Sequence, residues 1–107
     1  MKIFRFTLVV VLILILFSSF ALAAKGMVVF KKSRCDYFIV QTIMGYAILE
    51  WYGGNDPDEG DVIVGNFESY GMINIYNLTA DSELTVWVED YWLSKSRAIE
   101  EYYDKCH

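Results

Sequence analysis

Alternation of apolar and polar residues is the main pattern of the chain after residue 23, and it predicts short β-strands. Its clearest instance is the segment 84–89, whose aliphatic side chains at alternate positions fall on one face. Two segments rich in aromatic and β-branched residues, 37–43 and 46–52, predict strands joined by a tight turn at Gly45. Further strands are expected at 27–30, at 61–65 with a continuation through 66–71, and at 72–78, with a loop at 53–60.

The hydrophobic period changes near the carboxyl end, where residues 95–105 are expected to form one amphipathic helix. Ser94 supplies its amino-terminal cap, and Glu101 is spaced for ion pairs with both Arg97 and Lys105. The apolar residues recur at three- and four-residue spacing, at Ala98, Ile99, Tyr102, Tyr103 and Cys106.

Several short strands followed by one helix predict the fold class. We expect a mainly β (α+β) domain, a small five- or six-stranded barrel of OB-like or SH3-like architecture with one C-terminal amphipathic helix. An architecture of this kind implies no particular activity, so the function has to be argued from individual residues.

The amino end has the order of charge and hydrophobicity that is typical of a secretory signal peptide. Two basic residues precede an apolar stretch at 7–17, and a small-residue pattern at 21–23 marks a cleavage site before Ala24. We therefore expect residues 1–23 to be removed and residues 24–107 to form a single domain, exported to the periplasm or the cell exterior. A retained membrane anchor is the alternative, since about 20 apolar residues span a bilayer.

The cysteines, Cys35 and Cys106, lie near the two ends of the expected domain. An even number of cysteines in a small exported domain predicts a disulfide, which would close nearly the whole domain into one loop. A redox-active pair is the alternative, but it typically needs Cys-x-x-Cys spacing, which this chain lacks. We predict a structural Cys35–Cys106 bridge.

The charge balance bears on partners. The expected signal peptide contains two of the nine basic residues and none of the fourteen acidic ones, so the remaining domain has seven against fourteen, a formal charge of −7. Affinity for nucleic acid depends on basic side chains that release counterions, so nucleic acid is not an expected partner. We also expect no stable membrane insertion after cleavage, and a partner with basic character suits this charge.

Residues that support catalysis or metal binding are sparse. The only histidine is the terminal His107, so no Ser-His or Cys-His unit is predicted. The acidic loop at 56–61 departs from EF-hand spacing, which leaves weak calcium binding open, and we predict no metal site or cofactor. The triplet at 77–79 matches the N-glycosylation acceptor by chance. Paired carboxylates leave a small secreted hydrolase as an alternative, with candidates at Glu50, Glu68, Glu89 and Asp90.

Aromatic residues are the unusual feature, at 17% of the chain. A small barrel either buries such rings in a tapering core or leaves some of them exposed as a recognition face. We predict an exported, non-enzymatic binding module that recognises a protein or glycan partner through an acidic, aromatic face. An inhibitor of a basic envelope hydrolase is a narrower form of this hypothesis. The candidate binding surface consists of Trp51, Tyr52, Tyr70, Tyr91 and Trp92.

Overall fold

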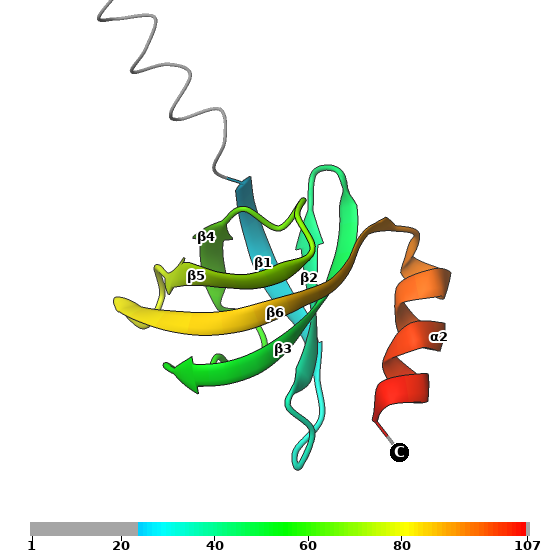
Figure 1. Ribbon diagram of the computed structural model, residues 1–107, viewed down its shortest axis with the longest axis horizontal. Helices are drawn as coiled ribbons and strands as arrows, with labels where there is room; N and C mark the ends of the chain where they lie inside the picture. Colours follow the sequence, from blue (N-terminus) through cyan, green and yellow to red (C-terminus); the bar gives the residue numbers. More distant parts are fainter. Residues whose placement is uncertain (1–23, 107) are drawn as a thin grey trace, which may run out of the picture.

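The computed structural model describes residues 24–106 as a closed antiparallel barrel of six strands with one helix against its side (Figure 1). Neighbouring strands follow the order β1-β2-β3-β6-β5-β4, and β4 pairs with β1 to close the barrel. The predicted barrel with a C-terminal helix is confirmed, whereas the predicted signal peptide and His107 lie outside the described residues. The elements are β1 (Ala24–Lys31), β2 (Tyr37–Thr42), β3 (Gly45–Gly54), β4 (Val62–Gly65), β5 (Gly71–Asn77), β6 (Ser82–Leu93) and α2 (Lys95–Lys105).

The barrel interior is filled by aliphatic and aromatic side chains from every strand. On β6, the alternating residues Leu84, Val86 and Val88 are fully buried, as the period-two pattern predicts. Closure of the sheet leaves no unpaired edge among these strands, which protects the backbone groups that an open sheet would expose. The other buried members of this core are Val28, Phe38, Val40, Ala47, Leu49, Ile63, Phe67 and Ile75.

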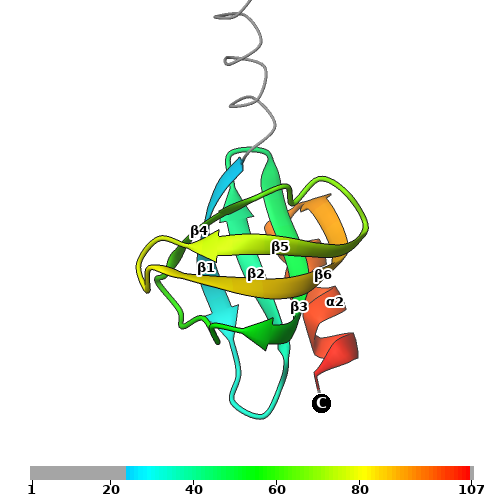
Figure 2. The ribbon, with the colours of Figure 1, turned by 60° about the vertical axis from the view of Figure 1, so that its left-hand side comes forward.

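A second core lies outside the barrel, between its wall and α2. Ile39 on β2 and Ile48 on β3 are buried there beneath Ala98 and Tyr102 of the helix. Adjacent residues of a strand point to opposite faces, so Ile48 faces the helix while its neighbour Leu49 belongs to the interior core. Figures 1 and 2 both show α2 on the side of the barrel formed by β2 and β3.

Several local predictions need correction. Residues 66–70 form a loop instead of extending a strand, because Phe67 fills the barrel interior and the pairing of β5 begins only at Gly71. β3 continues to Gly54, so the loop predicted to begin at residue 53 starts later.

The helix prediction is confirmed in its bounds and its cap but not in both of its ion pairs. The Ser94 hydroxyl accepts a hydrogen bond from the Arg97 N–H at 3.3 Å. Arg97 approaches Glu101 at 3.8 Å, as expected. Lys105, however, pairs with Glu89 on β6 at 3.0 Å, because the helix packs against the barrel and brings a strand carboxylate within reach.

The predicted Cys35–Cys106 disulfide is present, with the two Cα atoms 5.9 Å apart and a sequence separation of 71 residues. Cys35 lies in the loop between β1 and β2. Cys106 caps α2, and its N–H donates to the Tyr102 carbonyl at 2.9 Å. The bridge therefore ties the end of the helix to a loop of the barrel.

Asn77 is a buried polar residue that organises the loops at one end of the barrel. Its side-chain nitrogen donates to Asn55 Oδ1 and Asp61 Oδ2, both at 2.8 Å, and its oxygen accepts from the Ala80 N–H at 3.0 Å. A buried nitrogen with both donors in use is not presented to a glycosyltransferase, so the Asn-Leu-Thr triplet is no acceptor in the folded chain.

We expect Asn77→Ala to lower the free energy of unfolding by about 2 kcal/mol, because three part-buried hydrogen bonds of this buried side chain are lost. Urea denaturation measures this change. Asn74→Ala is the matched control on the same strand, since Asn74 is exposed and its variant should change stability by less than about 0.5 kcal/mol. Equal denaturation midpoints for the two variants would contradict the role assigned to Asn77.

Candidate binding face

Strand register aligns a row of side chains across the outer wall of the barrel. Tyr37 on β2 pairs with Glu50 on β3, Glu50 pairs with Trp87 on β6, and Trp87 pairs with Met72 on β5. The Cβ atoms of directly opposite residues on one face of a sheet lie about 5 Å apart, so the four residues are neighbours in a row. Figure 2 shows β3, β6 and β5 side by side across the front of the barrel. An aromatic ring, a carboxylate, a second ring and a thioether thus form a continuous strip.

Tyr52 extends this strip along β3. It is two residues beyond Glu50 and 54% exposed, while Trp87 is 37% exposed. We call the set Tyr37, Glu50, Tyr52, Met72 and Trp87 the binding face. Its flat rings and one central carboxylate are features of surfaces that bind other macromolecules.

The binding face is electronegative. The charge of Glu50 is the main cause that raises the pKa of the Tyr52 hydroxyl, and Glu89 adds to it. Burial, followed by the charges of Glu50 and Glu89, raises the pKa of Tyr37. The nearby ammonium of Lys105 is bonded to Glu89, and this contact raises the pKa of Lys105. The two hydroxyls therefore stay protonated and neutral at physiological pH.

The candidate surface predicted from sequence divides into separate groups. Trp51 packs against the barrel interior, and its indole N–H donates to the Asn55 carbonyl at 2.9 Å, whereas Tyr52 faces solvent. Tyr91 likewise packs against the interior core while Trp92 is exposed. Of the exposed members, Tyr52 lies on β3 and Trp92 lies at the end of β6. The predicted residues therefore do not form one patch.

The second group gathers where β6 ends. The ring centroids of Tyr70 and Tyr91 are 4.8 Å apart, and those of Tyr91 and Trp92 are 5.3 Å apart. The Tyr70 hydroxyl donates to Asp90 Oδ1 at 3.3 Å. Glu101 on α2 completes this group, because Asp90 lies close enough to raise the pKa of the Glu101 carboxyl, after the effect of burial. We call these five residues the aromatic corner.

The candidate residues predicted from sequence left out four contributors: Tyr37, Trp87, Met72 and Glu101. For Trp87 a signal was present, since the alternation that places Val86 and Val88 inside also places Trp87 outside. Met72 and Glu101 gave no such signal, because each joins its group through a residue that is distant in sequence, Trp87 for Met72 and Asp90 for Glu101.

The predicted carboxylates divide between surfaces, although Glu50 and Glu89 both act on Tyr37 and Tyr52. Glu50 lies in the binding face, Glu89 pairs with Lys105, Glu68 is exposed on the loop 66–70, and Asp90 joins Glu101. Asp90 and partial burial both raise the pKa of Glu101, with burial the larger cause.

The acidic loop at 56–61 is engaged in structural contacts. Asp56 forms an ion pair with Lys31, the Lys31 N–H donates to Glu59 Oε1 at 2.8 Å, and Asp61 Oδ2 accepts from the Asp58 N–H at 3.0 Å. Within residues 24–106, no group of three or more His, Cys, Asp or Glu side chains is placed to hold a metal ion.

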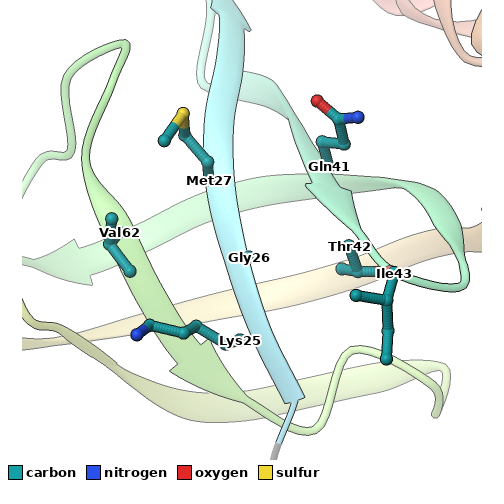
Figure 3. Close-up of a pocket in the computed structure, with 7 residues that line it drawn as sticks. All are labelled: Lys25, Gly26, Met27, Gln41, Thr42, Ile43 and Val62. Carbon is teal, nitrogen blue, oxygen red and sulfur yellow. The ribbon is translucent and has the colours of Figure 1, made fainter.

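An open groove of about 630 Å³ lies on a different part of the wall, over β1, β2 and β4 (Figure 3). Figure 3 shows Gly26 between Val62 on β4 and Thr42 on β2, with Lys25 and Met27 on either side of it along β1. Ile43 at the β2–β3 turn is 98% exposed beside this groove. Its lining is mostly apolar and contains one ionisable side chain, so it offers no pair of groups for acid–base chemistry.

Comparison with known proteins gives no match to this chain, whether with family models, curated proteins or solved structures. The assignment of function therefore depends on the two surfaces described above. In the part of the chain that the structure describes, no helix has the length and apolar character needed to cross a membrane.

Proposed function

We propose that this protein is an exported, non-enzymatic binding module of the periplasm or cell exterior that recognises a basic protein partner through the binding face. The observation that carries this proposal is the register-aligned row of Tyr37, Glu50, Trp87 and Met72. Rings and a thioether on a rigid barrel wall provide contact area at a low cost in side-chain entropy. The carboxylate between the two rings selects for a cationic group.

Charge supports a basic partner over a neutral one. The domain after residue 23 has a formal charge of −7, and Glu50 and Glu89 make the surroundings of the binding face negative. Opposite charge on a partner accelerates encounter and disfavours acidic competitors. An inhibitor of a basic envelope hydrolase is one form of this function. A glycan partner would instead depend on ring stacking, with little dependence on salt.

We expect Trp87→Ala to weaken partner binding by about tenfold or more, since buried Trp side chains dominate the binding energy of such interfaces. Tyr52→Ala should act in the same direction, and Glu50→Gln should have a smaller, salt-dependent effect. The partner is identified by crosslinking the exported protein in envelope extract. Titration calorimetry with the purified partner then gives the affinity of each variant.

Ile43→Ala is the matched control, because Ile43 is exposed and apolar but lies beside the groove in Figure 3. Circular dichroism confirms that each variant is folded. The proposal fails if Trp87→Ala binds the partner as tightly as the parent protein while Ile43→Ala loses affinity. Capture of a polysaccharide that resists high salt would also refute a basic protein partner, and turnover abolished by Asp90→Asn would support the hydrolase alternative.

A further inference from the structure

The aromatic corner is assembled from three parts of the chain. Tyr70 comes from the loop between β4 and β5, Asp90, Tyr91 and Trp92 come from β6, and Glu101 comes from α2. Tyr70 and Trp92 are 64% and 58% exposed, so two ring faces remain open to solvent beside two carboxyls. Aromatic faces and carboxylates both attract cations.

The backbone of Trp92 holds the corner in an unusual arrangement. On a regular strand, adjacent side chains point to opposite faces and their rings do not meet. Trp92 has a φ of 58°, in the left-handed region that bulky residues rarely adopt, and its ring contacts Tyr91 edge to face. Strain of this kind persists only where the surrounding structure imposes it, and it is concentrated at functional sites.

The charges at the corner are incompletely balanced. Partial burial, followed by hydrogen bonding with Asp90 and by the charge of Asp90, raises the pKa of Glu101. Two cationic side chains act against this effect, but Lys105 is bonded to Glu89 at 3.0 Å. Arg97 Nη2 is 3.8 Å from Glu101 Oε1, which is longer than a hydrogen bond. A guanidinium of the chain itself is thus drawn to the corner without forming a close pair.

We propose that the aromatic corner is a subsite for one arginine side chain of the partner, which stacks on the exposed rings and bonds to the carboxylates of Asp90 and Glu101. This inference rests on the proposed function and specifies which basic group the partner presents. A planar guanidinium suits the corner better than an ammonium, because its donors lie in a fork that spans two acceptors and its face stacks on aromatic rings.

Arginine binding at this subsite is linked to the ionisation of Glu101. A guanidinium favours the ionised form of Glu101, so the pKa of Glu101 falls when the subsite is filled. The groups facing Glu101 are Asp90 from β6, Tyr70 from the β4–β5 loop, and Arg97 and Lys105 from its own helix. The affinity should therefore be highest above the pKa of Glu101 in the free protein and decrease as the pH falls through that range.

The test uses the exported protein and the amidated tripeptide Gly-Arg-Gly, followed by NMR. Saturable shifts at the Trp92 indole N–H and the Tyr70 ring are expected, together with a lower pKa at the Glu101 carboxyl. Gly-Lys-Gly should bind more weakly. The same peptide with citrulline in place of arginine, whose side chain is uncharged, should not bind. Glu101→Gln should weaken the binding of Gly-Arg-Gly by about fivefold or more.

Glu68→Gln is the matched control, because it removes an equal charge from the exposed loop that carries Tyr70. Its affinity for the peptide should equal that of the parent protein. Equal losses for Glu68→Gln and Glu101→Gln, equal binding of the citrulline peptide, or shifts that never saturate would each overturn the subsite. Partner capture that depends on Trp87 but not on Glu101 would leave the proposed function standing and refute this inference alone.

Discussion

Replacing Cys35 by serine is expected to lower the free energy of unfolding by about 4 kcal/mol. The disulfide closes a loop in which its cysteines are 71 residues apart, so its loss restores much conformational entropy to the unfolded chain. Loss of the disulfide also releases the end of α2 from the β1–β2 loop. Urea denaturation of the oxidised protein and of the variant measures the difference.

The reduced parent protein is the control for this prediction. Its denaturation midpoint should match that of Cys35→Ser, and a reductant should leave the variant unchanged. Two free thiols in the purified, unreduced protein, detected by mass spectrometry, would contradict a structural bridge. An unchanged midpoint in the variant would show that the bridge contributes little to stability.

We expect Tyr102→Ala to cost about 4 kcal/mol, because it empties the centre of the core between α2 and the barrel. The Tyr102 side chain is fully buried, and its ring meets Phe30 edge to face at 4.9 Å. Its hydroxyl accepts a hydrogen bond from the Lys32 N–H at 2.9 Å. Tyr102→Phe keeps the packing and should cost only about 1 kcal/mol.

Tyr103→Ala is the matched control for the helix core. Tyr103 is adjacent in sequence and 45% exposed, with the Lys32 ammonium 4.3 Å from its ring. Its loss should cost about 1 kcal/mol or less. Chemical denaturation and the far-ultraviolet circular dichroism of α2 provide the measurements. Comparable losses for Tyr102→Ala and Tyr103→Ala would mean that the helix is not anchored through the buried ring.

The two largest effects are not expected to add. Both Cys106 and Tyr102 belong to the core that holds α2 against β2 and β3. Once one contact is lost, the helix can separate from the barrel and the second contact contributes less. The combination of Cys35→Ser with Tyr102→Ala should therefore cost less than the sum of the single changes.

Patterns among residues close together in the chain were sufficient to predict the main elements of this fold. The alternation of Leu84, Val86 and Val88 with polar residues predicted a barrel strand, because a period of two fits only an extended chain with one buried face. Ser94 and the spacing of Ala98 and Tyr102 predicted the helix and its buried side for an equally local reason. The disulfide followed from there being two cysteines in a domain of expected export.

The sequence by itself determined the strands, the capped helix and the identity of the bridged cysteines, since each follows from residues close in the chain or from a single pairing. Only the tertiary structure decided which side chains share a surface. The strip joining Glu50 to Trp87 depends on the register between β3 and β6, which includes irregularities that no local pattern specifies. The contact of Asp90 with Glu101 depends on how α2 docks, and the contact of Tyr91 with Trp92 depends on a left-handed residue at the end of a strand. These arrangements arise from packing between distant segments, where closing the barrel and covering Ile39 and Ile48 outweigh local preference.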